Sequence, residues 1–316
     1  MEVIDGELLA KKCDYSFGDQ SGRWGNCPNH EMVLCNIINT EFASKVFEVA
    51  KKRDYMTVFI DNIRLYKRDI KSVKEDDKDY VNYLMDMGTL FEVLEYYPTM
   101  KFIVFTNLED TPTDEYIFDA IPDNVLAVSA VNAEAYGGKV IPAPYGLQRK
   151  MYENDLRTPL LKKFTEEWPD HPPNLLYVSW MQDSNKERQG ITELFLDKEW
   201  ADVAEERKLY HEYIHEGIGL AKFVICPKGN AIDCHRNWEV AYMNRVPVLI
   251  DHPYMRDLFE WMDYPALFVN DYSEVTKELL EENDHLWKKA WGNSIRKSKL
   301  NLDVMFQSVI EEALAK

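Results

Sequence analysis

The 316-residue sequence lacks long hydrophobic runs and any segment that resembles an export signal. No apolar stretch approaches the roughly 18 residues that span a bilayer, and the N-terminus has no basic start followed by an apolar stretch and a cleavage site. We find neither internal repeats nor low-complexity tracts. These absences predict a globular, cytoplasmic protein with no membrane span. Apolar residues make up 46% of the chain, enough for two domains with substantial cores or one large one.

Cysteine is scarce, and its spacing predicts neither a disulfide framework nor a metal cluster. The five cysteines are Cys13, Cys27, Cys35, Cys226 and Cys234. An odd number of widely spaced cysteines favours reduced thiols. No C-x-x-C pair occurs, so zinc bound by Cys27, Cys35 and His30 is disfavoured, and we expect no metal site.

Basic residues are outnumbered, with 37 Lys and Arg against 55 Asp and Glu and a net charge of −18. This charge opposes nonspecific attraction to DNA or anionic membranes, because polyanion binding depends on Lys and Arg displacing counterions. The stretch 64–74 is a local exception, with basic residues at mostly helical spacing. It is either one basic face or a solvated helix balanced by the acidic residues that follow. Its members are Arg64, Lys67, Arg68, Lys71 and Lys74.

Short apolar segments alternate with helical spacers along most of the chain, which predicts an α/β fold with parallel sheets. We expect a helix over 42–52 and a final helix that Asp303 caps. The proline-rich region 142–173 is the expected junction between domains. The expected strands are 56–60, 102–106, 125–129, 175–179, 223–226, 246–250 and 267–269.

The segment 222–251 is the most informative, because a strand, a polar loop, a helix and a second strand follow one another there. Asp233 is expected to cap this helix, which places Arg236 and Glu239 on one face near its N-terminal end. Loops at the carboxyl ends of parallel strands, together with helix N-termini, attract phosphate.

The polar residues of this segment predict a site for a nucleoside diphosphate. Lys228 and Arg236 supply positive charge, and a carboxylate such as Glu239 suits the two hydroxyls of a ribose. The loop between the strand and the helix supplies backbone amides. We therefore include Gly229, Asn230 and Asp233 in the site.

The residues CPKGNAIDCHRNWE, followed by VPV, resemble the exostosin-like branch of glycosyltransferases. That family has a Cys-Pro-Arg-Gly segment, then an Arg, a Glu and a Pro-Val strand. The resemblance is specific over this segment and loose over the C-terminal half. It implies that Glu239 binds the donor ribose, while Arg236 and Lys228 bind the diphosphate. Lys228 stands where the family has Arg, and Asn244-Arg245 where a Gly commonly ends the helix, although Asn tolerates the left-handed cap.

The resemblance also implies the GT-B fold, in which two Rossmann-like parallel-sheet domains face a cleft. We expect residues 1–145 to form an acceptor-binding domain, 146–173 a linker and 174–300 the nucleotide-sugar-binding domain. The helix within 301–316 is expected to pack back on the first domain.

Three further residues are candidates for the donor site. His235 lies beside Arg236, where it either contacts the donor or is a hydrogen-bonded structural residue. Asn185 and Arg188 fall at the start of an expected helix. A cation such as Arg188 opposes the helix dipole there unless an anion lies alongside. Arg188 is therefore a candidate for the diphosphate, followed by Asn185, with a solvated surface as the alternative.

Sugar transfer requires a stabilised leaving diphosphate and, for an inverting reaction, a general base. No Asp-x-Asp is convincingly placed at a strand end, so we expect catalysis without an essential metal and with no cofactor beyond the UDP-sugar co-substrate. Asp19, in the glycine-containing stretch YSFGDQSGRWG, is the first candidate base, and Asp61, which ends a strand, is the second. The remaining candidates are His30, Glu109 and Asp110.

These observations predict a glycosyltransferase that carries a sugar from a nucleotide diphosphate, most plainly UDP, to an acceptor hydroxyl. One acceptor is a glycan, which the net charge favours. The other is a hydroxymethylated base in DNA, as for phage enzymes that share the GT-B architecture, which the basic stretch and the expected location favour. The alternative function is that of a non-catalytic protein that binds nucleotide sugars.

Overall fold

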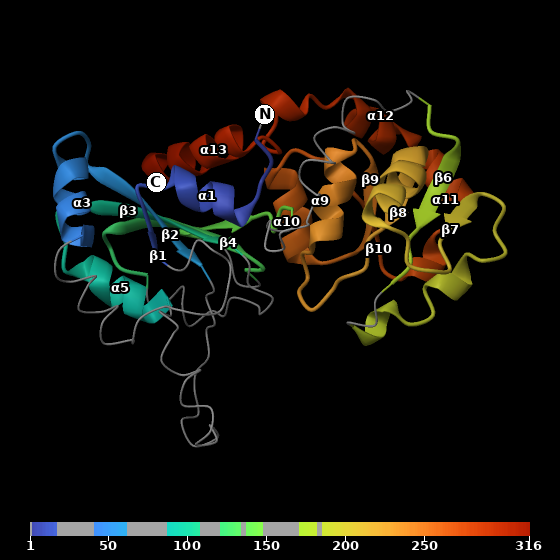
Figure 1. Ribbon diagram of the computed structural model, residues 1–316, viewed down its shortest axis with the longest axis horizontal. Coiled ribbons are helices and arrows are strands. Elements are labelled where there is room, and N and C mark those ends of the chain that lie inside the picture. Colours follow the sequence, from blue (N-terminus) through green and yellow to red (C-terminus); the bar gives the residue numbers. More distant parts are fainter. Residues whose placement is uncertain are drawn as a thin grey trace, which may run out of the picture. The chain divides into compact units, whose positions relative to one another are not determined.

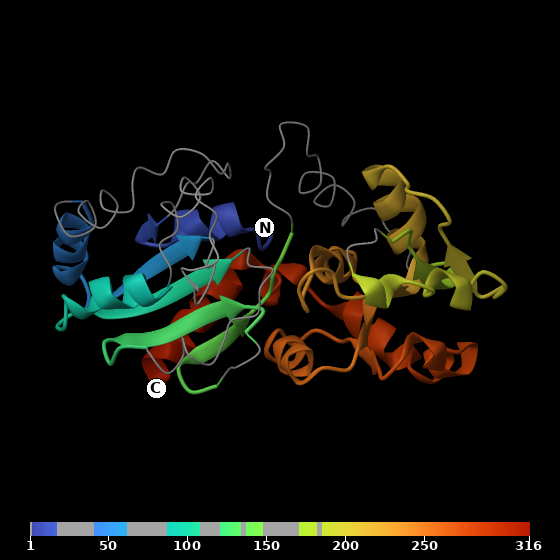
Figure 2. The ribbon, with the colours of Figure 1, turned by 90° about the horizontal axis from the view of Figure 1, so that it is seen from below.

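The computed structural model describes residues 2–17, 41–61, 87–107, 121–133, 137–147, 171–181 and 185–316. The chain forms two compact units that each combine distant parts of the sequence. Unit 1 comprises Met1–Asp5 and Pro144–Met305, and unit 2 comprises Gly6–Ala143 and Phe306–Lys316. Each unit is built around its own five-stranded sheet (Figures 1 and 2).

The sheet of unit 2 has its strands in sequence order, and every neighbouring pair is parallel. Its central strands are buried on both faces, as the unbroken apolar runs predict. Helix α3 (Glu41–Ala50) confirms the helix expected over 42–52 and buries Phe42, Val46 and Val49 on one face. The other helices of this unit are α1 (Gly6–Lys12) and α5 (Met87–Glu95). The strands are β1 (Tyr15–Phe17), β2 (Tyr55–Asp61), β3 (Lys101–Asn107), β4 (Val125–Val131) and β5 (Val140–Ala143).

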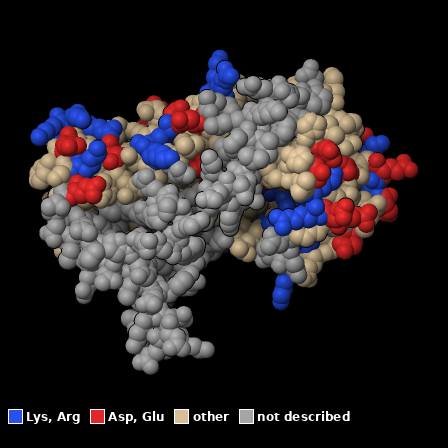
Figure 3. Space-filling view, in the orientation of Figure 1, with Lys and Arg blue, Asp and Glu red and all other residues tan. Residues whose placement is uncertain are grey.

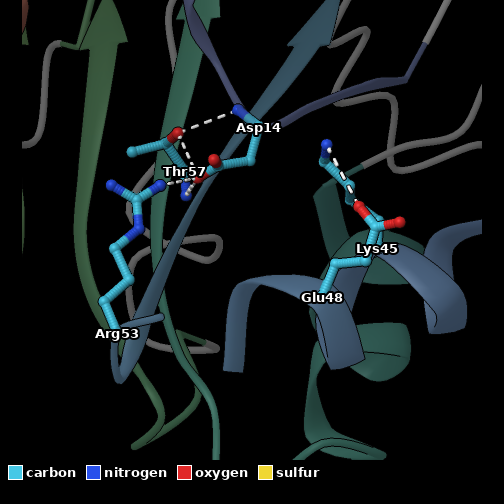
Figure 4. Close-up of polar contacts among 5 residues, drawn as sticks. All are labelled: Asp14, Lys45, Glu48, Arg53 and Thr57. Atoms are coloured by element: carbon cyan, nitrogen blue, oxygen red, sulfur yellow. Dashed lines mark hydrogen bonds and ion pairs between the residues drawn. The ribbon is translucent and has the colours of Figure 1, made fainter. Parts of the chain in front are cut away.

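Strand β1 is too short to have been expected from its sequence, and a polar cluster at its start holds it against β2 (Figure 4). The Asp14 carboxylate accepts hydrogen bonds from the Thr57 amide and hydroxyl, both at 2.8 Å. It also pairs with the Arg53 guanidinium, while the Asp14 amide donates to Thr57 Oγ1 at 3.0 Å. Because Thr57 is only 1% exposed, these contacts satisfy polar groups that would otherwise be buried without partners.

The sheet of unit 1 is also parallel, but its strand order is β10-β9-β8-β6-β7. The chain places β7 on one side of β6 and all later strands on the other side. The direction of winding therefore reverses between β6 and β8, which makes that position the topological switch point. The strands are β6 (Asn174–Val178), β7 (Ala201–Val203), β8 (Ala221–Ile225), β9 (Val246–Ile250) and β10 (Leu267–Val269).

The helices of unit 1 are mostly short. Helix α9 (His235–Tyr242) is followed two residues later by Asn244, whose φ of 55° confirms the expected left-handed residue at that end. Among the described residues, no helix is long and apolar enough to cross a membrane. The helices are α8 (Tyr210–Glu212), α9 (His235–Tyr242), α10 (Pro253–Trp261), α11 (Lys277–Glu282) and α12 (Asp284–Gly292), with the 3₁₀ or π turns η3 (Lys186–Arg188), η4 (Thr192–Leu194), η5 (Tyr213–Gly217), η6 (Ile218–Leu220), η7 (Tyr272–Glu274) and η8 (Ile295–Lys297).

The last helix, α13 (Leu302–Ala315), starts one residue before Asp303, so the expectation that Asp303 caps it is wrong. The Asn301 side chain instead accepts a hydrogen bond from the Asp303 amide at 3.2 Å. From Phe306 onward the helix belongs to unit 2, where Phe306 stacks on Phe105 with ring centroids 4.8 Å apart.

Two α/β units with parallel sheets confirm the expected GT-B-like fold class. The expected assignment of an acceptor to one domain and a nucleotide sugar to the other concerns function and stays a prediction.

Candidate functional site

The strand order of unit 1 defines where a ligand site is expected. In open parallel sheets, ligands bind beyond the carboxyl ends of the strands at the switch point. In this unit that position lies between β6 and β8. The loop after β6 leads to η3, and the loop after β8 leads to α9. The two loops carry most of the residues that the sequence assigns to the donor.

The loops are joined by side chains that reach from one to the other. Arg188 donates from Nε to the Lys228 carbonyl at 2.7 Å and from Nη2 to the Pro227 carbonyl at 3.3 Å. Asn185 Nδ2 donates to the Gly229 carbonyl at 2.8 Å. The structure therefore brings Asn185 and Arg188 next to the motif loop, although about 40 residues separate the two segments in sequence.

Asn185 also has the capping role that its sequence position predicts, although the helix is only a 3₁₀ turn. Its Oδ1 accepts from the Glu187 amide at 2.9 Å at the start of η3. Glu187 in turn pairs with the Lys228 ammonium at 2.7 Å. Because the Lys228 side chain is 40% exposed, this ion pair is of the weak surface kind and leaves the ammonium near solvent.

Gly229 lies against the Arg188 guanidinium. A Cβ atom placed on it would be 3.2 Å from Arg188 Nη2. The absence of a side chain at this position therefore lets the guanidinium lie against the loop. Asn230, the next residue, is exposed.

Arg236 is half-buried in the first turn of α9, and it has a guanidinium nitrogen without a partner. Nη2 donates to the Trp180 carbonyl at 3.4 Å, after β6. Nη1 is shielded from solvent and forms no hydrogen bond with any described residue. Burial lowers the pKa of Arg188, and the positive charge of Arg236 lowers it further. Two cations thus lie close together in a partly dry position, which is an arrangement that an anion stabilises.

Glu239 is the only acidic residue of α9 and is 6% exposed. Its Oε1 accepts from the Tyr210 hydroxyl at 3.1 Å, and its Oε2 accepts from the Tyr213 hydroxyl at 3.0 Å. Sequence reasoning did not identify either tyrosine. The spacing of the two tyrosines, three residues apart, is the only sequence signal that places them on one face of a helical segment.

Asp233 does not cap α9, which corrects the expectation from sequence. The N-cap is Cys234, whose backbone is extended. The fully buried Asp233 carboxylate instead accepts from the Tyr145 amide at 2.7 Å, the Asn237 amide group at 2.8 Å and the Trp238 indole at 2.8 Å. Burial raises the pKa of Asp233 to about 6, although these donors oppose the shift. Its contacts connect α9 to the segment after β5.

His235 also contacts that segment, as its structural interpretation predicts. Its Nδ1 lies 2.8 Å from the Gly146 carbonyl, and its ring is 4.4 Å from that of Tyr145. Because a carbonyl can only accept, Nδ1 carries the proton. Contact with a donor stays a prediction.

The other end of α9 contacts two further segments of unit 1. The Tyr242 hydroxyl accepts from the Ile4 amide at 2.6 Å and donates to the Leu300 carbonyl at 2.6 Å. Together with Tyr145 and Gly146, these residues lie close to the three points at which the chain leaves unit 1. The helix that carries Arg236 and Glu239 thus contacts three separate segments of unit 1.

Several expected residues lie outside the described part of the chain. Asp61 is the last residue of β2, but its side chain is not described. Within the described ranges no cluster of three or more His, Cys, Asp or Glu could hold a metal, and Cys13, Cys226 and Cys234 are free thiols. Of the residues that the sequence analysis names, the following lie outside the described part of the chain: Asp19, Cys27, His30, Cys35, Arg64, Lys67, Arg68, Lys71, Lys74, Glu109 and Asp110.

Comparison with known proteins gives fold-level resemblance alone. No protein-family model and no curated protein sequence matches the chain. Among solved structures, α,α-trehalose-6-phosphate synthase from Burkholderia multivorans is 10% identical with a TM-score of 0.40, over 90% of this chain and 74% of that one. The N-terminal domain of Candida albicans trehalose-6-phosphate phosphatase is 10% identical with a TM-score of 0.37, over 92% and 77%. At these values neither structure assigns a substrate or a residue role to this chain.

Proposed function

We propose that the protein is a glycosyltransferase that binds a nucleotide diphosphate sugar at the switch point of unit 1. UDP-sugars are the first donors to test. One observation carries the proposal. The buried Nη1 of Arg236 has no partner among the described residues, and Arg236 is close enough to Arg188 to affect its pKa. A diphosphate would supply the missing acceptor and compensate both charges.

The same residues have a chemical role in the proposed reaction. As the bond to the sugar breaks, negative charge develops on the leaving diphosphate, and guanidinium groups held in place beforehand stabilise it. Lys228, whose ammonium remains near solvent, adds a third positive charge. Glu239, three residues after Arg236 on α9, would receive the ribose hydroxyls.

The catalytic base is proposed to come from unit 2. Asp19 remains the first candidate and Asp61 the second, because Asp61 occupies the carboxyl end of a parallel strand. The cations of unit 1 perform the charge stabilisation that a metal supplies in other transferases, so we propose a reaction that proceeds without one. Undiminished turnover after treatment with a chelator would support that point, and loss of turnover would refute it.

The acceptor is either a glycan or a hydroxymethylated base in DNA. On the face shown in Figure 3, Lys and Arg side chains of the described residues lie interspersed with Asp and Glu. The basic residues proposed to contact DNA are Arg64, Lys67 and Arg68. Neutralising these three should weaken DNA binding and flatten its dependence on salt if DNA is the acceptor. An unchanged salt slope would leave the glycan as the acceptor.

The first experiment measures UDP release from a panel of UDP-sugars, with and without duplex DNA that contains hydroxymethylcytosine. Release stimulated by DNA, with an added sugar mass on the DNA, would establish both reaction and acceptor. Slow release that is indifferent to DNA would support transfer to a glycan or to water. Tight UDP binding without release from any donor would favour a non-catalytic nucleotide-sugar binding protein.

Variants then separate binding from transfer. Asp19→Asn and Asp61→Asn should keep UDP affinity, and the one that removes the base should eliminate transfer. Arg236→Ala should lose both properties. Full transfer by both Asp variants would contradict the proposed bases.

A further inference from the structure

The two tyrosines that contact Glu239 come from a single short segment. Tyr210 begins α8, and Tyr213 begins the π turn η5 that directly follows it. Each hydroxyl donates to a different oxygen of the same carboxylate, at 3.1 Å and 3.0 Å. Contacts to both oxygens fix the rotation of the carboxylate about its terminal bond, which a single contact would not do.

Contacts at both ends of the segment place the two hydroxyls in the absence of a ligand. At its start the Leu209 amide donates to the Glu212 carboxylate at 2.9 Å. At its end Gly217 packs directly on the Tyr177 ring, where a Cβ would come within 2.3 Å of Tyr177 Cζ. Any side chain at position 217 would displace either this segment or the Tyr177 ring. π turns of this kind occur frequently at functional sites.

The rings of the two tyrosines also form part of a row of three neighbouring aromatic rings. The rings of Tyr210 and Tyr213 are 5.9 Å apart, and those of Tyr213 and Tyr177 are 6.4 Å apart. Burial raises the pKa of Tyr213 well above its usual value, and the charge of Glu239 raises it further. The Tyr213 hydroxyl therefore stays protonated and remains a donor throughout the physiological pH range.

We propose that Tyr210 and Tyr213 are positioning residues that orient Glu239 and make the site selective for a ribonucleotide over a 2′-deoxyribonucleotide. The inference rests on the proposed function, in which Glu239 receives the ribose. In that proposal the two phenol hydroxyls hold the carboxylate in the orientation in which it receives the ribose hydroxyls. Fixing the carboxylate in advance removes the cost of ordering it on binding. In a 2′-deoxyribonucleotide one ribose hydroxyl is missing, so the oriented Glu239 carboxylate lacks one donor and binds this ligand more weakly.

The test measures UDP and 2′-deoxy-UDP affinity by calorimetry for the wild type, Tyr210→Phe, Tyr213→Phe and the double variant. We expect the wild type to prefer UDP by roughly ten- to hundredfold, as for a lost hydrogen bond to a charged group. Each Phe variant should bind UDP more weakly and reduce that preference, and the double variant should bring it to within roughly threefold.

Tyr177→Phe is the matched control. Its ring lies in the same row, but its buried hydroxyl forms no hydrogen bond with any described residue. This variant should keep the wild-type preference for UDP. If Tyr213→Phe fails to fold, Tyr210→Phe decides the question alone, because its hydroxyl bonds the other carboxylate oxygen.

The outcomes separate this inference from the proposed function. An unchanged UDP preference in the folded Phe variants, with UDP still bound, would overturn the positioning role and leave nucleotide binding intact. A wild type that binds neither nucleotide would overturn the proposed function itself. A reduced preference in the Phe variants alone would support both.

Discussion

Arg236 has a buried guanidinium nitrogen that no described residue pairs with, and such groups commonly serve ligands rather than stability. Its Nη2 has one long hydrogen bond, and its Nη1 has none within the described ranges. Burying a guanidinium N–H group without an acceptor costs free energy, and a bound anion that accepts from it removes that cost.

The first prediction follows from that cost. Arg236→Met keeps an aliphatic stem and removes the charge. UDP affinity should fall by roughly 30- to 100-fold, since a charge-assisted hydrogen bond is lost, while the free energy of unfolding without nucleotide should stay equal or rise. Calorimetry and urea titration measure the two quantities. Arg256→Met is the control, because Arg256 is exposed and pairs with Asp251. Unchanged UDP binding with a large loss of stability would contradict the assignment.

Asp233 yields a prediction about pH. Burial raises its pKa to about 6, above the value of roughly 4 in an unfolded chain. The folded protein therefore binds the extra proton between these values. The stability that this group contributes is complete below about pH 4 and is lost as pH rises through about 6.

This contribution is measured by comparing the wild type with Asp233→Asn, which cannot titrate. Urea unfolding from pH 7 down to pH 4.5 should show the wild type gaining stability relative to the variant as pH falls, by on the order of 2 kcal/mol. A difference that is constant with pH, or that shrinks on acidification, would mean that the Tyr145, Asn237 and Trp238 donors keep the carboxylate ionised.

At the scale of elements, the shortest strands depend most on tertiary contacts. Strand β1 has three residues, and its position relative to β2 is fixed by the cluster of Asp14, Arg53 and Thr57 (Figure 4). A strand of this length cannot be stable by itself, so the polar cluster determines whether it pairs at all.

Asp14→Ala should therefore destabilise unit 2 by about 2–3 kcal/mol, because the buried Thr57 hydroxyl and amide both lose their acceptor. Far-UV circular dichroism during urea unfolding measures this change. Glu48→Ala is the surface control, since its contact with Lys45 is a 3.8 Å ion pair between exposed side chains and should change stability by less than about 0.5 kcal/mol. Equal effects of both substitutions would contradict the role of the cluster.

At the scale of the molecule, the division into two units makes ligand binding visible by spectroscopy. The chain has eight tryptophans, and only Trp24 falls within the residues of unit 2. Tryptophan fluorescence therefore reports almost entirely on unit 1, while far-UV circular dichroism reports on both sheets.

Saturating UDP should shift the fluorescence transition to higher denaturant. At a free concentration of about 100 times Kd the added stability is about 2.7 kcal/mol. The dichroism curve should contain one component that shifts with it and another that does not. If the fluorescence and dichroism curves coincide with each other both in the absence and in the presence of UDP, the two units unfold together. A fluorescence transition that UDP leaves unmoved would count against the nucleotide site in unit 1.

The fold could be predicted from the sequence wherever the information was local. The expected strands that became β2, β3, β4, β6, β8, β9 and β10 are continuous apolar runs, and their burial on both faces of a parallel sheet is sufficient to identify them. The motif likewise predicted where Lys228, Arg236 and Glu239 lie, because their spacing within one loop and one helix determines which of them share a face. Asn244 was recognisable because few other residues tolerate a positive φ.

Other features depended on partners that are distant in sequence. Strands β1, β5 and β7 have three or four residues each and exist because of their neighbours in the sheet. Asp233 was expected to cap α9, but Tyr145, nearly ninety residues earlier, supplies a backbone donor to its carboxylate. The two tyrosines on Glu239 are placed by the packing of Gly217 on Tyr177. Local spacing thus determined which chemical groups the site has, whereas the strand order decided which of them meet, because only pairing in the sheet brings the ends of β6 and β8 together.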